Sequence, residues 1–528
     1  MKRVISLILV AATLFMLCSC TMTDSSAQLT MGIFDSVVNL DPLYATGDGE
    51  RIVATNCFEG LLRFDSKGKI DLGGATAYSV SKDNLVYTFR LNPSAVWHVS
   101  KSTQTILEEL GITEFDNTIT AEDYVFGIKR FIETGYADLN AIKGAKEYSA
   151  DNTAEIGVAA IDEYTLQITL AYKDPDFLYK LATLPVYPCE QSFLDALNNI
   201  YYSNPSTLLC NGPYYVEEVL ETETILKRNP DYTGKVQIQN KSILLYITGK
   251  RNAMESRFTE GKYDIYLTPS TSRISGNTTS YTSIDATWGL AFNCSTSVGS
   301  IAELRSILLS TIDYSKIELP AFATGKADRI IPNNYTVGDA SYSDFSPAKL
   351  SYAKNAKVAQ ANLEVLLKRT GKEAYTIELS IPAPLETSMS AIIENWQALF
   401  EDKILFDTRI FDVEDVDKIL AEGNYDLAIL PLSPVYKTAF GMLDAVSGAP
   451  CNYKDKKMTA LRSQLKTSNE ENAALCGRME KHLVDNGVFV PLFFSSNDLY
   501  LGDGVKGVYL ANGGSMIYLH SGSKPEAK

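Results

Sequence analysis

The chain has 528 residues, 45% of them hydrophobic and 10% aromatic, so it holds enough apolar material for about three domains with full cores. Its formal net charge of -16 at pH 7 argues against nucleic acid as a partner and against docking on anionic lipid head groups. Histidine occurs only three times, at scattered positions, so we expect no histidine-based zinc site, and we expect no other metal or cofactor.

The first residues have the pattern of an export signal. Lys2 and Arg3 precede an apolar run over residues 4–17, and small residues then lead to Cys20. The run is shorter than the roughly 20 apolar residues that a membrane span needs, and no later stretch approaches that length. A cysteine directly after the cleavage point resembles the lipobox of bacterial lipoproteins, in which its sulfur is acylated. We therefore predict a signal peptide over 1–19 and a tether over 20–28 that is lipidated at Cys20; a secretory signal with an incidental cysteine is the alternative.

Helix and strand patterns alternate along the body, which favours mixed α/β domains. Residues 86–91 and 165–171 alternate apolar and polar positions with period two, as half-buried strands do. Between them, Thr120 is expected to cap a helix with Tyr124 and Ile128 on its apolar face.

Two segments, 258–269 and 420–431, repeat one local design. Each reads as a helix end, a glycine (Gly261 or Gly423) suited to the position after the helix, a Tyr-Asp pair and a buried strand closed by proline. The shared cap chemistry explains the repeat by itself. Because ligands bind at the carboxyl ends of strands in open α/β sheets, these strand ends are also expected to face a cleft.

Six cysteines follow Cys20, and none forms a Cys-x-x-Cys motif. Their wide spacing is more typical of ordinary buried cysteines than of a disulfide framework. Among the possible bridges, Cys189 with Cys210 is the most plausible.

Several short segments carry a family resemblance in order along nearly the whole chain. They are Leu40-Asp41-Pro42, Glu59-Gly60-Leu61, Ile119-Thr120-Ala121-Glu122-Asp123-Tyr124, Asn211-Gly212-Pro213-Tyr214, Asn229-Pro230-Asp231-Tyr232, Phe292-Asn293 and Val490-Pro491-Leu492. The ordered set resembles the large extracytoplasmic solute-binding proteins of ABC importers, in the oligopeptide- and dipeptide-binding family. Each segment is weakly specific alone, but their order is specific.

The resemblance implies an α/β, two-lobed, periplasmic-binding-protein-like fold with a hinge and an additional third domain. The family's first lobe is discontinuous and would here comprise 29–57, 171–269 and 489–521. The additional domain would comprise 58–170, and the second lobe 270–488.

The resemblance also implies a lipid-anchored substrate-binding protein on the extracytoplasmic side of a bacterial cell membrane. It would capture a peptide-like or other extended polar solute by lobe closure, act as a monomer, and deliver the solute to the permease and ATPase subunits of an importer. The sequence contains no Gly-x-Ser-x-Gly elbow, no His-Glu-x-x-His and no phosphate-binding glycine loop, so we expect no enzyme and assign no catalytic residue.

One departure from the family concerns the ligand. Its peptide binders hold the peptide's α-amine with an aspartate in a Trp-x-Ala-Asp-Tyr-type strand end. With Tyr436 aligned, Val435 stands at the aspartate position and Leu432 at the tryptophan position. A buried ammonium without a carboxylate partner is strongly disfavoured, although Asp426 or another carboxylate could substitute. An oligosaccharide ligand, or a signalling or scaffold role without standard peptide binding, therefore stays open.

The candidate ligand-binding residues follow from the resemblance. Trp288 is expected either to form an aromatic wall of the cleft or to pack in a core, and the segment of Thr46 and Gly47 to be either a contact loop beside the hinge or a plain surface loop. The full set is Thr46, Gly47, Tyr266, Thr268, Trp288, Ser433, Val435, Tyr436 and Phe494.

Overall fold

The computed structural model describes residues 27–112, 114–197, 200–269, 274, 279–345, 355–466 and 468–525. The predicted signal peptide, Cys20 and nearly all of the tether lie outside these residues. Within them, we find no helix with the length and apolar character to cross a membrane.

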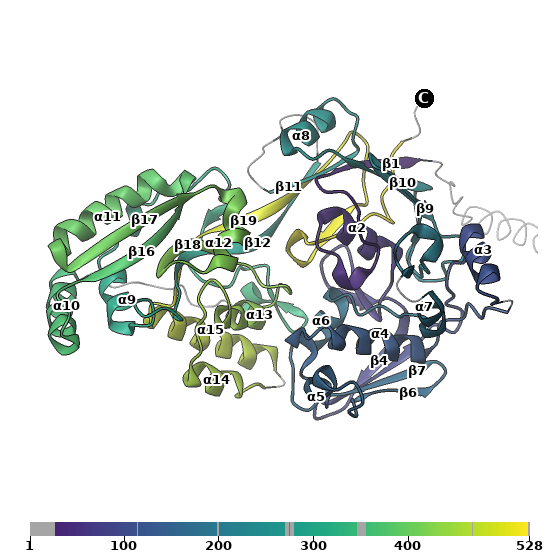
Figure 1. The fold of residues 1–528 in the computed structure, drawn as a ribbon, viewed down its shortest axis with the longest axis horizontal. Coiled ribbons are helices and arrows are strands. Elements are labelled where there is room, and N and C mark those ends of the chain that lie inside the picture. The colour runs from purple at the N-terminus through teal and green to yellow at the C-terminus, as the bar shows by residue number, and fades with distance from the viewer. Residues whose placement is uncertain are drawn as a thin grey trace, which may run out of the picture.

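An eleven-stranded mixed sheet runs through both lobes of the molecule (Figure 1). The strand order is β17-β16-β18-β12-β19-β11-β1-β10-β9-β8, and β13 pairs with β19 outside this path. The two longest strands, β12 and β19, pair antiparallel at its centre and extend from one half of the molecule into the other. The strands are β1 (Gln28–Ile33), β8 (Tyr214–Val219), β9 (Glu223–Arg228), β10 (Ser242–Ile247), β11 (Ile265–Pro269), β12 (Thr279–Phe292), β13 (Gly325–Lys326), β16 (Tyr375–Pro382), β17 (Ile404–Phe411), β18 (Leu427–Leu432) and β19 (Phe489–Leu501).

Each half of this sheet has its own hydrophobic core, which divides the molecule into two lobes. In lobe I the strands around β1 pack against α2, with Leu29, Ile243 and Leu499 fully buried. In lobe II, β16 to β18 pack against helices that include α11, on which Trp396 is fully buried. The helices of these layers are α2 (Asp48–Cys57), α8 (Arg251–Thr259), α9 (Ala302–Leu309), α10 (Ala356–Thr370), α11 (Glu386–Phe400) and α12 (Val416–Glu422).

A helical layer completes lobe II next to β12 and β18. It consists of α13 (Ala439–Asp444), α14 (Lys456–Arg462) and α15 (Asn469–Asp485) and has a separate core that includes Phe440 and Leu475. In Figure 1 this layer lies below the sheet and faces the remaining part of the chain.

That remaining part is a third domain built on an antiparallel four-stranded sheet, β4-β5-β7-β6. Its strands β5 and β7 and the Thr120-capped helix α4 confirm the three predicted elements. Helices α6 and α7 share its core, through Phe177, Leu181 and Phe193. The domain boundaries stated above remain predictions. The elements are β4 (Ala75–Val80), β5 (Val86–Leu91), β6 (Val158–Asp162), β7 (Thr165–Thr169), α3 (Lys101–Glu109), α4 (Ala121–Glu133), α5 (Ala145–Ala150), α6 (Phe177–Thr183) and α7 (Gln191–Leu197).

Three short two-stranded sheets complete the described strands. They are β2 (Leu62–Phe64) with β3 (Ile70–Leu72), β14 (Thr336–Val337) with β15 (Ala340–Ser341), and β20 (Tyr509–Ala511) with β21 (Met516–Tyr518).

The repeated local design has the predicted helix end, glycine and strand in both places; Pro269 ends β11, whereas β18 continues past Pro431 to Leu432. Gly261 and Gly423 follow α8 and α12 with positive φ values of 72° and 62°, a conformation that glycine adopts without strain. The aspartates that follow fix the adjacent parallel strands, because Asp264 accepts a hydrogen bond from a backbone amide of β1 and Asp426 accepts one from β16. The repeat is therefore a structural device for strand docking.

The six described cysteines all carry free thiols, in accordance with the expectation of ordinary buried cysteines. The suggested Cys189–Cys210 bridge is wrong. Cys210 lies against Cys57, whereas the Cys189 sulfur accepts a hydrogen bond from the Tyr202 hydroxyl.

Candidate functional site

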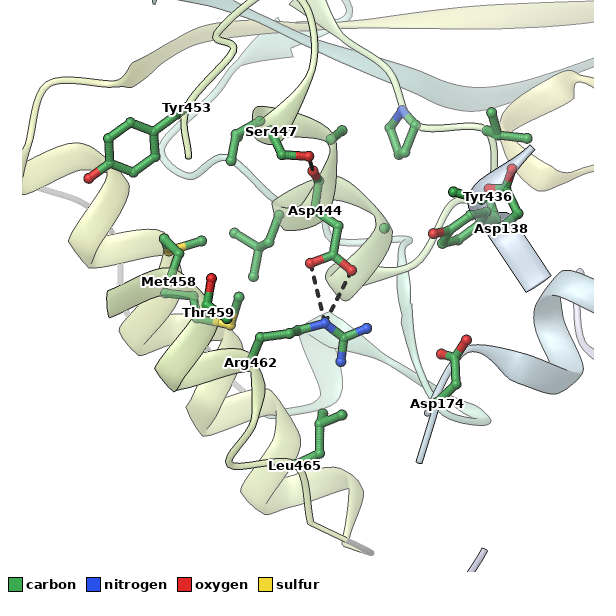
Figure 2. A pocket seen from close by; sticks show the side chains of 18 of the residues that line it. Asp138, Asp174, Tyr436, Asp444, Ser447, Tyr453, Met458, Thr459, Arg462 and Leu465 are labelled. Atoms are coloured by element: carbon green, nitrogen blue, oxygen red, sulfur yellow. Dashed lines mark hydrogen bonds and ion pairs between the residues drawn. The ribbon is translucent and has the colours of Figure 1, made fainter. Parts of the chain in front are cut away.

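A cavity of about 1010 Å³ lies between the third domain and the helical layer of lobe II (Figure 2). This volume is at the upper end of the range for small-molecule sites. One wall comes from the third domain and α6, and the other comes from the segment after β18 and from α13 and α14. The residues used below are Asp138, Tyr172, Asp174 and Lys180 on the first wall, and Ser433, Val435, Tyr436, Leu443, Asp444, Asp455, Met458 and Arg462 on the second.

The carboxyl end of β18 delivers three of the predicted binding residues to this cavity. Ser433, Val435 and Tyr436 all line it, in the segment that directly follows the strand. Their position agrees with the rule that ligands bind at the carboxyl ends of strands. Val435 is 62% exposed, so the position where the family has an aspartate faces open space.

An ion pair forms much of the wall on the third-domain side. Lys180 Nζ contacts Asp174 Oδ2 at 2.8 Å, donates to the backbone oxygen of Asp138 at 2.9 Å, and lies 4.9 Å from the ring centroid of Tyr436. Burial acts to lower the pKa of Lys180, but the charges of Asp174 and Tyr436 outweigh it and raise that pKa. Lys180 therefore stays charged.

A second ion pair forms the base of the opposite wall. Arg462 on α14 donates through Nε to both carboxylate oxygens of Asp444, at 3.2 and 3.1 Å, as the dashed lines in Figure 2 show. The guanidinium lies 4.4 Å from the ring centroid of Phe440, and its Nη1 is buried without a hydrogen-bond partner. Burial raises the pKa of Asp444, and Arg462 opposes the shift.

The segment after β18 also contacts the other side of the cavity directly. The Thr438 hydroxyl donates to Asp176 Oδ2 at 2.8 Å, the Lys437 amide donates to Asn512 Oδ1 at 2.9 Å, and Asn512 Nδ2 donates to the Val435 oxygen at 2.8 Å. We call these three hydrogen bonds the clasp. Asp176 precedes α6 and Asn512 begins the short 3-10 helix Asn512–Gly514, so the clasp joins lobe II to both the third domain and the C-terminal part of the chain.

The clasp contains a carboxylate with a strongly shifted pKa. Burial and the charge of nearby Asp174 together raise the pKa of Asp176 to about 7, while Arg462 opposes the shift. The other carboxylate oxygen of Asp176, Oδ1, is buried without a partner.

A second polar group lies beside the clasp, next to the long strands β12 and β19. Lys437 Nζ donates to the backbone oxygen of Asp285 at 2.8 Å and to the Ser433 hydroxyl at 2.7 Å, and the Ser495 hydroxyl donates to Asp285 Oδ1 at 2.8 Å. Burial lowers the pKa of Lys437 to about 8, although Asp285 opposes the shift. The Lys437 bond fixes the segment after β18 to β12, and the Ser495 bond joins Asp285 of β12 to β19.

The other predicted residues lie outside the residues that line the cavity. The backbone amides of Thr46 and Gly47 donate to Glu50 in the first turn of α2, at 2.9 and 3.4 Å. Tyr266 and Thr268 on β11 are 1% and 2% exposed, and Tyr266 packs with the aromatic residues beneath α8. Contact of these four residues with a ligand remains a prediction.

Trp288 and Phe494 are packed in lobe II. Trp288 is 5% exposed, stacks on Phe493 with centroids 5.7 Å apart, and donates through Nε1 to the Ser495 hydroxyl at 3.1 Å. Phe494 is 9% exposed on β19, where its backbone pairs with β13. Of the two expectations for Trp288, packing in a core is the one that matches its surroundings in this structure. Contact of Trp288 with a ligand remains a prediction.

Asp426 does not supply a carboxylate to the cavity. Its side chain accepts hydrogen bonds from the Glu378 amide and the Thr296 hydroxyl, and it stands just before β18, at the opposite end of the strand from Ser433. The carboxylates that line the cavity instead include Asp138, Asp174 and Asp444.

None of these three acidic residues, nor Lys180 or Arg462, was predicted from the sequence as part of the site. A local signal was present in Asp174-Pro175-Asp176, a charged segment that follows β7 and directly precedes the apolar helix α6. Asp138 and Arg462 carry no such signal, because packing of the third domain against lobe II brings them to one cavity. In the described part of the chain, no group of three or more histidines, cysteines or acidic residues is arranged to hold a metal ion.

Comparison with known sequences identifies related proteins. The family profile described as "Bacterial extracellular solute-binding proteins, family 5 Middle" matches residues 69–454. The oligopeptide-binding protein AmiA of Streptococcus pneumoniae is 28% identical over 272 residues, which are 49% of this chain and 40% of that protein. The dipeptide-binding protein of Lactococcus lactis is 28% identical over 267 residues, 48% of this chain and 46% of that protein. The chain thus spans less than half the length of these curated relatives.

Comparison with solved structures gives matches along nearly the whole chain. OppA of Listeria monocytogenes bound to peptide has a TM-score of 0.70 at 19% identity, covering 95% of this chain and 99% of that one. The murein tripeptide binding protein MppA of Escherichia coli has a TM-score of 0.70 at 20% identity, with the same coverage of both chains. At these identities the likeness concerns the fold, and it confirms the predicted two-lobed α/β architecture with an additional domain.

Proposed function

Because the chain belongs to the bacterial extracellular solute-binding proteins of family 5, we propose that it is the substrate-binding protein of an ABC importer. In this proposal it captures a peptide-like solute in the cavity between the third domain and lobe II and performs no chemistry on it. The observation that carries the proposal is the cavity itself, with charged groups of both signs on facing walls.

The lining of the cavity suits a peptide. Charged residues of both signs, Asp174 with Lys180 and Asp444 with Arg462, alternate with apolar side chains such as Leu443 and Met458. A peptide presents the same combination of charged termini, polar backbone and apolar side chains. The names of the relatives AmiA and the dipeptide-binding protein agree with this ligand class.

We further propose that the solute is enclosed by movement of the lobes. The clasp joins the two sides of the cavity through side-chain and backbone hydrogen bonds, and the long strands β12 and β19 connect the lobes. Bending of these strands, with the clasp opening and forming, would give the hinge closure by which two-lobed proteins enclose ligands.

The location follows from the same proposal. Cleavage before Cys20 and acylation of its sulfur would hold a monomeric protein at the outer face of the bacterial cell membrane, close to the permease and the ATPase subunits. Anchoring is stable when two or more acyl chains are attached, because each buried CH₂ contributes roughly 0.8 kcal/mol.

Native mass spectrometry of the gently purified protein tests the ligand class. We expect a ladder of co-purified peptide masses that disappears on mild unfolding and returns when peptides are added back. A bound mass of hexose units would contradict the peptide proposal and favour an oligosaccharide. Failure of every peptide and sugar to bind would contradict the transport proposal and favour a signalling or scaffold role.

A further inference from the structure

Two cysteines lie against each other where the third domain joins lobe I. Cys57 is the last residue of α2, and Cys210 lies shortly before the first residue of β8. The chain leaves lobe I at Cys57 and returns to it at Cys210, and the core of the third domain is built from residues between them. The two thiols are neighbours in the core of lobe I, where Cys57 is 0% and Cys210 2% exposed. We call these two residues the neck pair.

Hydrogen bonds between the two chain crossings fix the backbone around the neck pair. The Gly212 amide donates to the Cys57 oxygen at 2.9 Å. The Glu59 amide donates to Asn211 Oδ1 at 2.9 Å, and Asn211 Nδ2 donates back to the Glu59 oxygen at 2.8 Å. Gly212 comes so close that a Cβ atom there would lie 2.6 Å from the Cys57 carbonyl carbon. The fold therefore keeps the two thiols together.

The other neighbouring cysteines are arranged differently. Cys294 and Cys451 also lie close, because the Cys294 amide donates to the Cys451 oxygen at 2.7 Å. Their thiols, however, donate to two different backbone oxygens, those of Phe292 and Val488. In the part of the chain that the structure describes, the thiols of the neck pair have no such acceptor and contact each other.

We propose that the neck pair is the site of a disulfide bond, formed while the protein folds outside the cell. This inference rests on the proposed location, since exported chains meet conditions in which thiols are oxidised. One thiolate of the pair attacks the disulfide of an extracytoplasmic thiol oxidase, and the second thiolate displaces the oxidase and closes the Cys57–Cys210 bond. The pair loses two protons and two electrons, which convert the oxidase disulfide into two thiols.

Burial determines when this bond can form. Burial, and to a smaller extent the contact with Cys210, raises the pKa of the Cys57 thiol well above its ordinary value. The thiolate that reacts is therefore scarce once the domain has folded. Oxidation belongs to the folding process, before the pair is covered, and the finished bond is shielded from reductants.

The bond would fasten the third domain to lobe I. It closes a loop of chain that contains the core of the third domain, and in the chain-entropy model a cross-link restricts the unfolded chain more as this loop grows. It also joins the two chain crossings at one point, so that the third domain does not swing on them independently. During closure, lobe II is then the part that moves, against a unit made of lobe I and the third domain.

The test maps cysteine pairing in the full chain, purified from the membrane of a bacterium that exports it. Free thiols are alkylated in denaturant, and the protein is digested without reduction by trypsin and by a protease that cleaves after glutamate. Both proteases are needed, because Cys189 and Cys210 share a tryptic peptide that is divided at Glu190. We expect residues 52–59 linked to residues 191–217, with a mass lower by two hydrogen atoms than the sum of the reduced peptides. Alkylation of both neck-pair thiols, or a bond from Cys57 to any other cysteine, would overturn the inference.

Cys476→Ala is the matched control for Cys57→Ala, because both remove a fully buried thiol and Cys476 lies in the separate core of the helical layer. Cys476→Ala should keep the linked peptides, whereas Cys57→Ala should leave Cys210 alkylated. Loss of the link in both variants would overturn the inference.

The same digest reports whether Cys20 carries lipid, which separates this inference from the proposed location. A lipidated Cys20 with an alkylated neck pair overturns the inference and leaves the location standing. A Cys20 without lipid counts against the location, and the reduced chain is then refolded with oxidised glutathione. A Cys57–Cys210 link after refolding supports the site, and its absence overturns it.

Discussion

Glu480 shows how a single buried carboxylate holds two parts of lobe II together. It is 1% exposed on α15 and accepts hydrogen bonds from the backbone amides of Ile330 and Ile331, at 2.6 and 2.9 Å, and from the Tyr342 hydroxyl at 3.3 Å. Glu480→Ala leaves two buried amides unpaired and should lower the free energy of unfolding by about 3 kcal/mol. Glu480→Gln keeps an acceptor oxygen and should cost less than half as much, as measured by chemical denaturation at pH 7.

The pH dependence of the same variant gives a second measurement. Burial raises the pKa of Glu480 from 4.5 to about 7, although the Ile331 and Ile330 amides oppose the shift. Between these two pH values the folded state binds a proton that the unfolded state releases, so this group makes the protein more stable as the pH falls from 7 toward 5. Glutamine has no such proton. The melting temperature of wild type should therefore rise relative to that of Glu480→Gln over this range, and a constant difference would contradict the prediction.

At the residue scale, the family resemblance pointed to the residues that follow β18. Ser433, Val435 and Tyr436 were expected in the binding site on that basis and they line the cavity, while their contact with a ligand remains a prediction. The sequence could not place Asp138 and Arg462 in the site, since a charged residue in a short loop or on a short helix has the same local pattern whether it faces solvent or a cavity. Only the packing of the third domain against lobe II distinguishes the two cases.

At the scale of elements, the turns after α8 and α12 allow a matched comparison. Gly261 and Gly423 both have positive φ, a conformation that costs other L-residues about 1–2 kcal/mol. Gly261→Ala and Gly423→Ala should each lower the free energy of unfolding by about 1 kcal/mol. The added methyl group causes no close contact. In Gly423→Ala its nearest neighbour would be Asn293 Nδ2 at 3.9 Å, and in Gly261→Ala no atom would lie within 4 Å of it.

Gly325→Ala is the control for this pair. Gly325 also has open space around it, but its φ is outside the positive range that disfavours alanine. This variant should change the free energy of unfolding by less than about 0.5 kcal/mol. If it were as destabilising as the other two, the turn conformation would not be the cause.

The same elements show why local structure could be predicted and the sheet could not. The strands β5 and β7 and the helix α4 follow from apolar periodicity and a cap within one short segment. The order of the large sheet joins β1 to β10 and β11 to β19, residues that are more than 200 positions apart. No local pattern encodes such pairings, and the two-lobed architecture was predicted through the family resemblance.

At the scale of the whole molecule, Asn512 is the point where lobe II contacts the C-terminal segment. Its side chain accepts from the Lys437 amide and the Tyr179 hydroxyl and donates to the Val435 oxygen. Two of these bonds, those with Lys437 and Val435, reach lobe II. If each contributes about 1 kcal/mol net, removing the side chain shifts the proposed balance between closed and open forms by roughly 2 kcal/mol, or about 30-fold, toward the open form. Asn512→Gly removes these bonds and still accommodates the positive φ of 47°.

We expect Asn512→Gly without ligand to have a larger radius of gyration than wild type in small-angle X-ray scattering, and to bind added peptides more weakly. Asn84→Gly is the matched control, because Asn84 also has a positive φ, 57°, but lies in the turn between β4 and β5 of the third domain. It should scatter as wild type does. A saturating peptide should return Asn512→Gly toward the wild-type radius, since binding favours the closed form if the lobes close as proposed. Identical scattering of the unliganded variant and wild type would mean that the two Asn512 bonds of the clasp do not hold the lobes together, and that closure depends on the Thr438–Asp176 bond or on other contacts between the lobes.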